Sequence, residues 1–183
     1  LSSPFSIKAI ELLEKVKVPA WKIGSGEFFS KSMIYKILDN NKPIILSTGL
    51  STMKEISKMV KLFKIKKKKF ILMQCTSTYP CNIDDVGINI LDDFIKKFKC
   101  PVGLSDHSGS IYPSLYAMTK GASIIEVHVG DKKDKKNPDN TSSISFEELN
   151  ELVKARNLIY RMKIRPIKKN KLNKKLKRIK QIF

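Results

Sequence analysis

The stretch PVGLSDHSGSIYPSLYAMTKGASIIEVH, residues 101–128, contains a short apolar strand pattern, a helical segment and a second apolar strand pattern. His107 ends the first strand pattern and His128 ends the second, and the chain has no other histidine. In a parallel α/β sheet the carboxyl ends of neighbouring strands open onto one shared crevice. The pattern therefore predicts that the two imidazoles converge at a metal or catalytic site.

Strand and helical patterns alternate in the same way along the rest of the chain. Apolar strand patterns separated by helical patterns occur at residues 20–24, 43–46, 70–74, 102–104 and 123–127. Two helices begin with a capping box, Thr52 with Glu55 and Ser145 with Glu148, and the second runs to about residue 162. Strand and helix repeated in this order predict an α/β fold, with a parallel sheet and helices outside it.

Polar side chains follow the predicted strands rather than scattering along the chain. They are Ser25 and Glu27, Ser47 and Thr48, residues 76–79, residues 105–107, and His128. In a (β/α)8 barrel the active site is built from the loops after the strands, whereas an open doubly wound sheet has its site at one switch point. Polar groups at five consecutive strand ends favour the barrel.

The composition favours a globular protein over a membrane-spanning or secreted one. With 183 residues, 42% of them hydrophobic, the chain can form one globular core. Its apolar runs are far shorter than the ~20 residues of a membrane span, and its first residues lack the pattern of a signal peptide. The odd number of cysteines, three, is typical of reduced thiols. We expect a cytoplasmic protein with no membrane partner.

The net charge of +19 could indicate a protein that binds nucleic acid. From Arg161 to the end there are 11 lysines and arginines and no acidic residue, and a second cluster comprises Lys64 and lysines 66–69. No aromatic residue interleaves the basic tail before Phe183, and no RNA- or DNA-binding motif occurs. This charge suits weak binding at low salt, but no specific nucleic-acid partner is expected.

Lys22 stands inside an apolar strand pattern. It either faces solvent from an edge strand or meets an anion inside, because alternate residues of a barrel strand point inward. Ser25, Ser47 and Ser105 follow neighbouring strands and suit phosphate oxygens as small donors. Together with Lys22 they form a candidate cradle for phosphate or carboxylate.

Three further residue types bear chemistry. His107 and His128 are candidate nitrogen ligands for manganese, iron or zinc, with carboxylates close by in the sequence. Glu27 is a general acid or base, a ligand of sugar hydroxyls, or a solvated glutamate near a helix start. Asp139 follows the last strand pattern, where it either closes the site or serves as a turn residue.

Five segments, taken in order, are specific enough to indicate a family. They are SPF at 3–5, WKIGSGE at 21–27, ILSTG at 45–49, QCTSTYP at 74–80 and VGLSDH at 102–107, and EVH at 126–128 and PD at 138–139 follow them. In this order and spacing, over residues 3–162, the chain resembles the sialic acid synthase (N-acetylneuraminate synthase) family. Members of that family condense phosphoenolpyruvate with an N-acetylated hexose.

The resemblance implies a (β/α)8 TIM barrel followed by an antifreeze-like domain, and a homodimer for the full-length enzyme. On this basis the barrel is incomplete here and runs from the end of strand 3 through strand 8. Residues 1–162 are then a partial barrel domain, and residues 163–183 are a basic linker toward an antifreeze-like domain. In that linker Leu172, Leu176 and Ile179 have helical spacing.

The resemblance also implies roles for individual residues. His107 and His128 hold a divalent metal, usually manganese, with magnesium or cobalt as alternatives. Phosphoenolpyruvate is bound through its phosphate by Ser3, Lys22, Ser25 and Ser47, and at its carboxylate end by Ser77 and Ser105. The sugar is bound by Glu27, Tyr79 and Asp139, of which Glu27 and Asp139 are assigned as catalytic.

The expected reaction joins phosphoenolpyruvate to N-acetylmannosamine or a similar hexose, giving a nonulosonic acid and phosphate. We expect it to be impaired here, because five strands cannot close an eight-stranded barrel. Two alternatives stay open: an inactive truncated remnant or basic binding polypeptide, and another phosphoenolpyruvate-dependent keto-sugar-acid synthase. Departures from the family pattern at Ser3, Ser77, Val127 and Asn137 leave the sugar open, including the precursors of legionaminic and pseudaminic acids.

Overall fold

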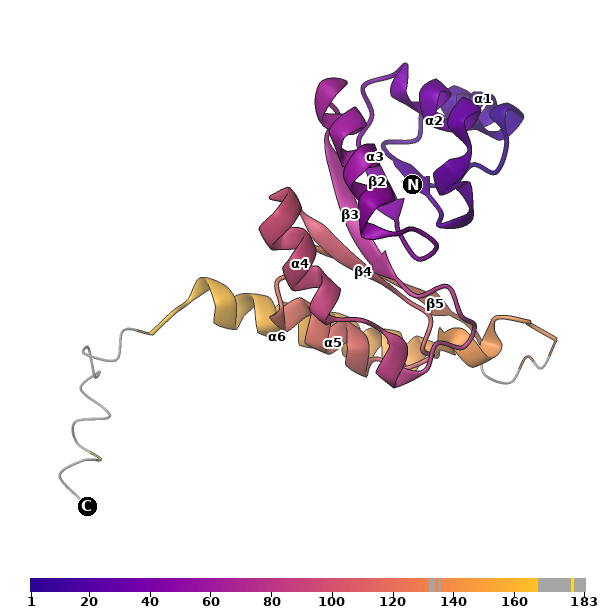
Figure 1. The fold of residues 1–183 in the computed structure, drawn as a ribbon. Helices are drawn as coiled ribbons and strands as arrows, with labels where there is room; N and C mark the ends of the chain where they lie inside the picture. Colours follow the sequence, from indigo (N-terminus) through magenta and orange to yellow (C-terminus); the bar gives the residue numbers. More distant parts are fainter. Residues whose placement is uncertain (132–133, 135, 168–178, 180–183) are drawn as a thin grey trace.

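The computed structural model describes residues 1–131, 134, 136–167 and 179. At its centre six parallel strands lie side by side in chain order (Figure 1). The strands are β1 (Trp21–Ile23), β2 (Ile44–Ser47), β3 (Phe70–Cys75), β4 (Val102–Asp106), β5 (Ile124–Val129) and β6 (Ser143–Ile144). The predicted α/β class with a parallel sheet is confirmed.

The helices lie on the outer side of the sheet (Figure 1). Those numbered 2 to 5 connect successive strands, because a connection between parallel strands must cross back over one face. The helices are α1 (Ile7–Lys15), α2 (Lys31–Leu38), α3 (Met53–Ile65), α4 (Asn89–Phe98), α5 (Tyr112–Thr119) and α6 (Phe146–Ile164). Short 3₁₀ helices form η1 (Gly26–Phe29), η2 (Ile83–Asp85) and η3 (Asn140–Ser142). Within the described ranges, no helix is both long and apolar enough to cross a bilayer.

The sheet is strongly curled, as one ion pair demonstrates. Lys22 lies on β1 and Glu126 on β5, with three strands between them. Neighbouring strands are ~4.8 Å apart, so in a flat sheet these two strands would be about 19 Å apart. Their side chains nevertheless meet, with Lys22 Nζ 3.3 Å from Glu126 Oε1. The six strands therefore form a curled half-barrel whose concave face carries both side chains.

The opposite, outward face of the sheet packs against the helices. Leu46, Leu72 and Leu104 on the strands have no exposed surface, and Phe63 of α3 and Phe94 of α4 are at most 1% exposed. Burying an apolar side chain of this size contributes roughly 1.5–3 kcal/mol. This layer holds the curl in place and leaves the concave face free for polar residues.

Two details of the strand prediction were wrong. A sixth strand, β6, pairs in parallel with the end of β5 through His128 and Ser143. It has only two residues, too few for a recognisable alternation of apolar and polar positions. The same pairing extends β5 to Val129, so His128 lies within the strand rather than after it. His107, in contrast, directly follows β4 as predicted.

The predicted helix starts are confirmed. Thr52 with Glu55 and Ser145 with Glu148 form complete capping boxes at α3 and α6, which satisfy backbone N–H groups that a helix start leaves without partners. The helix α6 ends at Ile164, close to the predicted end. Of the predicted helical spacing in the basic tail, only Ile179 lies within the described residues.

Gly103 on β4 provides a test of the sheet packing. A Cβ atom at this position would lie 2.4 Å from Ile124 Cγ2 and 2.5 Å from the Ile124 carbonyl oxygen on β5. We expect Gly103→Ala to lower the free energy of unfolding by about 2 kcal/mol, because the clash involves backbone and can be relieved only by moving a strand. Gly26→Ala is the matched control, since a Cβ there has no atom within 4 Å. Equal urea-unfolding midpoints for the two variants would contradict this packing.

Candidate active site

The concave face of the sheet becomes polar toward the carboxyl ends of its strands. The register pairs Cys75 of β3 with Ser105 of β4, and Ser105 with Glu126 of β5. Paired residues point to the same face, because side chains alternate along each strand. These three side chains therefore form one layer around the curl, where the sequence predicts a site.

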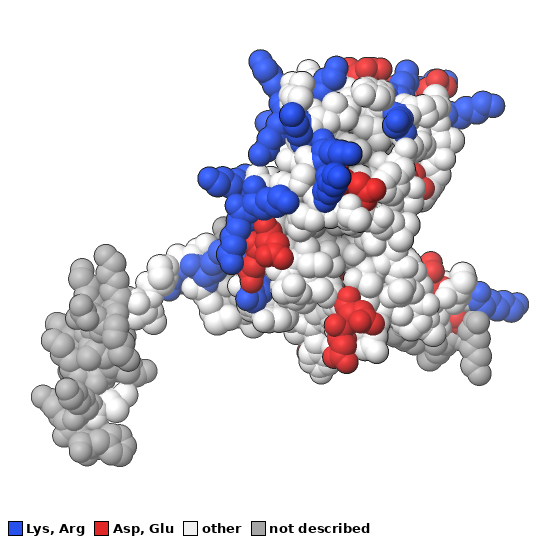
Figure 2. All heavy atoms as spheres, in the orientation of Figure 1, with Lys and Arg blue, Asp and Glu red and all other residues white. Residues whose placement is uncertain are grey.

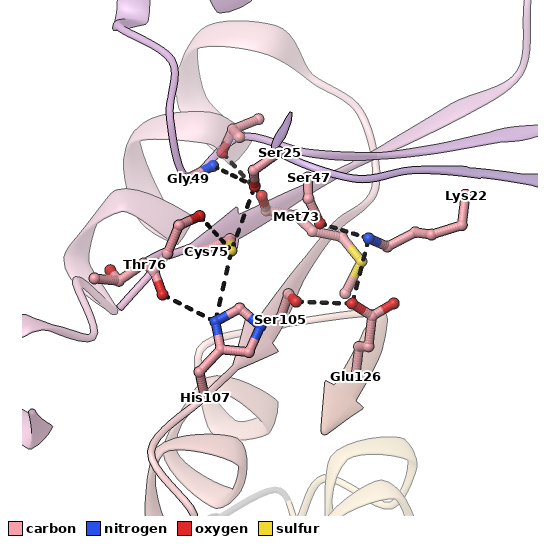
Figure 3. A network of polar contacts seen from close by, with 12 residues as sticks. Lys22, Ser25, Ser47, Gly49, Met73, Cys75, Thr76, Ser105, His107 and Glu126 are labelled. Carbon is pink, nitrogen blue, oxygen red and sulfur yellow. Dashed lines mark hydrogen bonds and ion pairs between the residues drawn. The ribbon is translucent and has the colours of Figure 1, made fainter. Parts of the chain in front are cut away.

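Lys22 is the centre of a hydrogen-bonded group in this layer (Figure 3). Its Nζ donates to Ser47 Oγ at 2.7 Å and forms the ion pair with Glu126. Ser105 Oγ donates to the same carboxylate oxygen, Glu126 Oε1, at 2.8 Å. Lys22 is only 6% exposed, so of the two predicted alternatives the structure excludes a solvent-facing edge lysine.

Glu126 is a member of this group that the sequence analysis noted only as a neighbour of His128. The sequence contained a signal for Glu126, namely its spacing from His128. Residues two apart on a strand share a face, so Glu126 points inward together with His128. The carboxylate balances the buried lysine, whose burial without a partner would be costly. An anion entering the site therefore meets a cation that is already ordered.

A second group of donors gathers around Cys75. The Gly49 N–H donates to Ser25 Oγ at 3.0 Å, Ser25 Oγ donates to Cys75 Sγ at 3.5 Å, and Ser77 Oγ lies 3.7 Å from the same sulfur. A Cβ at Gly49 would lie 2.3 Å from Ser77 Oγ and 2.9 Å from Cys75 Sγ, so a larger residue there would displace these side chains. All three cysteines are free thiols, as predicted. A role for Cys75 within the site was missed, because a single thiol gives no spacing pattern.

His107 is fixed by contacts on both ring nitrogens. Nδ1 lies 2.9 Å from the Thr76 carbonyl oxygen, and Nε2 lies 3.0 Å from the Tyr79 hydroxyl. A carbonyl can only accept, so in the neutral ring the proton is on Nδ1 and the Nε2 lone pair accepts from the Tyr79 O–H. The Tyr79 ring also stacks on the imidazole, with centroids 4.1 Å apart.

His128 lies beside this pair. Its ring centroid is 5.3 Å from that of His107 and 5.7 Å from that of Tyr79, both in edge-on arrangements. On its other side, His128 Nδ1 is 3.7 Å from Asp139 Oδ2. The structure thus brings together the two histidines, Tyr79 and Asp139 from three separate parts of the chain.

The pKa values of this region reflect burial and nearby donors. Burial raises the pKa of the Tyr79 phenol and of the Asp106 carboxyl, the latter against hydrogen bonds from Ser108 and Ser114. Burial would lower the pKa of His107, but its contacts with Cys75 and Thr76 hold that pKa above the ordinary value. Burial would raise the pKa of Cys75, but hydrogen bonds from His107 and Ser25 hold it below the usual range.

The two histidines fit a metal ion of the open, catalytic kind. The His107 Nδ1–H donates to the Thr76 carbonyl, which is the usual support of a metal-binding imidazole. The Nε2 lone pair accepts from the Tyr79 hydroxyl in this structure, so a metal ion bound at Nε2 would have to displace that hydroxyl. Among the residues the structure describes, no group of three or more His, Cys, Asp or Glu side chains is placed to hold a metal. Two protein ligands would leave the other positions to water or substrate oxygens.

Two predicted site residues lie apart from these groups. In the described part of the chain, neither Ser3 nor Glu27 forms a side-chain hydrogen bond with the other predicted site residues. The Glu27 carboxylate instead lies against Gly24 at the end of β1, where a Cβ at Gly24 would be 2.5 Å from Glu27 Oε2. Both residues sit near the open β1 edge of the half-barrel, where Ser2 forms a bridge with Trp21.

A curled parallel sheet with helices outside and polar side chains at its carboxyl strand ends is the arrangement of a barrel-type α/β enzyme. The model of one such family, the NeuB family, matches residues 1–166. The chain belongs to the NeuB family, and the predicted relationship to sialic acid synthases is confirmed.

Relatives of known activity are synthases. The chain is 35% identical over 155 residues to pseudaminic acid synthase of Campylobacter jejuni, covering 84% of this chain and 45% of that protein. It is 31% identical over 154 residues to N-acetylneuraminate-9-phosphate synthase of Homo sapiens, covering 84% and 43%. The crystal structure of N-acetylneuraminic acid synthetase from Leptospira borgpetersenii matches with a TM-score of 0.86 at 30% identity, covering 98% of this chain and 62% of that one. The chain spans about half the length of these curated relatives.

Proposed function

We propose that this chain carries the phosphoenolpyruvate-binding and aldehyde-binding parts of a nonulosonic acid synthase. The reaction joins phosphoenolpyruvate to an N-acetylated hexose and releases phosphate. One observation carries the proposal: a buried, paired lysine with serine donors lies on the same concave face as two adjacent imidazoles. The first arrangement suits an anion, and the second would hold a divalent metal ion that could polarise a carbonyl group.

The anion end of the site consists of donors that are in place before the ligand arrives. Lys22 Nζ with Ser47, and Ser25 with the Gly49 N–H, are the proposed contacts of the phosphate, to which Ser3 would add from the β1 edge. Ser105 and Ser77 would contact the carboxylate end. Preorganised donors cost little reorganisation when charge moves onto the departing phosphate.

The sugar end is formed by the aromatic and acidic groups around the histidines. His107 and His128 would hold the divalent metal, manganese in this proposal, which when bound polarises the sugar aldehyde. Tyr79 and Asp139 flank the two imidazoles and would bind sugar hydroxyls. Glu27 and Asp139 are the proposed residues for proton transfer.

In this proposal the site residues support two successive steps, formation of the C–C bond and release of phosphate. Held at its phosphate by Lys22 and at its carboxylate by Ser105, phosphoenolpyruvate presents C3 to the aldehyde carbon, and this positioning is worth several powers of ten in rate. A C–C bond forms, and the aldehyde oxygen takes a proton from a carboxyl group of the site. Water then adds at C2 and loses one proton to the carboxylate that the first step left behind. The new C2 hydroxyl gives its proton to the phosphate as the C2–O bond breaks, which leaves a ketone at C2 and hydrogen phosphate. Lys22 and the serines stabilise the leaving dianion.

We further propose that the half-barrel is part of a (β/α)8 barrel, which acts as a homodimer and has its mouth at the described strand ends. Its helices lie outside and its polar layer inside, as in a closed barrel. Among the described strands, the outer edge of β1 carries only the bridge from Ser2 to Trp21, and β6 is the last strand of the sheet. For this half-barrel by itself we expect slow turnover, because solvent on the concave face would screen the charges of the site.

Binding and turnover test the proposal separately. Calorimetry with phosphoenolpyruvate and manganese should give binding that inorganic phosphate at equal concentration displaces only weakly, because phosphate lacks the carboxylate that Ser105 would contact. Phosphate release should be slow and should require both phosphoenolpyruvate and a sugar, and a panel of N-acetylmannosamine and diacetylated amino hexoses would rank the sugars. Phosphate release that is independent of sugar would contradict the proposal.

A further inference from the structure

The end of the sheet opposite the candidate site carries an uninterrupted series of lysines. Helices run antiparallel to the strands, so the loops that enter β1 to β4 lie together at the amino ends of four adjacent strands. These loops and helix ends contain Lys15 and Lys17, Lys42, lysines 66–69, lysines 96–97, and Lys99. We name this group the basal lysine arc. Figure 2 shows lysines gathered along the upper left of the molecule, where α3 and α4 of Figure 1 end.

Other side chains of the molecule do not neutralise this arc. In the described ranges none of its lysines forms an ion pair. The carboxylates at this end of the sheet include Asp39, in the loop before β2, and Glu14, near the end of α1, which accepts a hydrogen bond from Asn40 Nδ2. Lys42 lies over the Trp21 ring at 5.1 Å, and Lys68 donates to the Asn40 carbonyl. The remaining lysines of the arc are exposed to solvent. Their charges therefore act outward, toward a binding partner.

The backbone positions three of these lysines at a conformational cost. Lys17, Lys67 and Lys99 follow the last residue of α1, α3 and α4 by one or two positions, and their φ angles are positive, at 55°, 51° and 51°. Side chains other than glycine and asparagine rarely adopt this conformation. A lysine here complements the negative end of the helix dipole. The three positions lie in the loops before β1, β3 and β4, at the same end of the sheet.

Exposed aliphatic side chains lie among the lysines. Val16, between Lys15 and Lys17, is 64% exposed, and Ile65, at the end of α3, is 65% exposed. A hollow of about 560 Å³ at the same end has an apolar floor, including Ile45 and Ile71, and lysines at its margin. Lysines interleaved with exposed aliphatic groups suit a membrane interface, where the charges meet anionic headgroups and the apolar groups enter the acyl boundary.

We propose that the basal lysine arc binds the surface of an anionic lipid bilayer. Nucleic acid is less favoured, because the arc has no arginine for bidentate phosphate contacts and no exposed aromatic ring for base stacking. The absence of a spanning helix has no bearing on surface binding. Because the arc and the candidate site lie at opposite ends of the strands, a bound protein would keep its site facing the solvent.

Vesicle co-sedimentation of the full chain tests the proposal. We expect binding to vesicles of phosphatidylcholine with 30% phosphatidylserine at 0.1 M salt, and its loss at 1 M salt, where screening acts within ~3 Å. Replacing Lys66, Lys69, Lys96 and Lys97 with Gln should weaken binding by several hundredfold, at about fivefold per lysine. Val16→Ser with Ile65→Ser should weaken it further without changing the net charge.

The control replaces four exposed lysines outside the arc, Lys8, Lys31, Lys54 and Lys58, with Gln. It has the same net charge and the same basic tail, and it should retain nearly full binding. Circular dichroism melting would establish that both variants fold. Equal loss in both variants, equal binding by both, or no binding of the parent chain would overturn the proposal. The proposal would also be overturned if the chain bound duplex DNA more tightly than vesicles and if the double variant Val16→Ser with Ile65→Ser bound that DNA as well as the parent does.

Discussion

Alanine at both His107 and His128 is expected to abolish manganese binding by this protein. The two imidazoles are adjacent. Asp139 lies beside His128, but in the described residues no group of three or more His, Cys, Asp or Glu side chains is placed to hold a metal. Outer contacts of a metal site already contribute about 10–100-fold to affinity, so loss of both direct ligands should cost at least about a thousandfold. Calorimetry or electron paramagnetic resonance of added Mn²⁺ measures this directly.

The same double variant contains its own control. Glu126 of the Lys22 group lies on β5 with His128, and Ser105 lies on β4 just before His107. The group nevertheless shares no hydrogen bond with either histidine, so affinity for phosphate alone should stay within about twofold of the parent. Replacing Tyr112, an exposed residue of α5, with Phe should change neither ligand. Manganese affinity that survives the double replacement would remove the metal assignment, whatever happens to phosphate.

Lys22→Met is expected to weaken phosphoenolpyruvate binding on the order of a hundredfold, because a charged hydrogen bond of this kind contributes about 1.5–3 kcal/mol. Methionine keeps much of the volume and removes the charge. The free energy of unfolding should stay level or rise slightly, because the Glu126 side chain is 39% exposed and water can solvate it once its partner is gone.

Lys31→Met is the matched control for this change. Lys31 is an exposed residue at the start of α2, so the substitution and the change in net charge are identical while the concave face is untouched. Calorimetric titration of both variants, with thermal unfolding alongside, separates loss of a ligand from loss of charge. If the two variants bind phosphoenolpyruvate equally, Lys22 is a structural lysine and the anion site lies elsewhere.

Much of the fold could be predicted from the sequence because its signals are local. Apolar strand patterns of three to five residues alternate with helical patterns, and the capping boxes at Thr52 and Ser145 locate two helix starts. The strand β6 could not be found in this way, because Ser143–Ile144 owes its pairing to the neighbouring His128 and has no periodicity of its own. Whether the sheet is open or closed depends on contacts between distant strands.

The candidate site was predictable to the extent that strand ends share an edge. That rule indicated His107, His128, Lys22 and the serines as neighbours. It could not identify the partner of Lys22, since the contact with Glu126 depends on how far the sheet curls. The same rule could not separate residues at the carboxyl ends of the strands from residues at the β1 edge, such as Glu27. Sequence spacing does not indicate the path of a loop.

The ion pair between Lys22 and Glu126 also links ligand binding to folding. More than half the chain separates the two residues, so the anion site exists only when the whole sheet has formed and curled. A partly unfolded chain has no such site, and any anion that binds it stabilises the native state in proportion to its occupancy. The melting temperature of the chain is thus a measure of ligand affinity, and a thermal-shift screen could rank candidate substrates without any turnover.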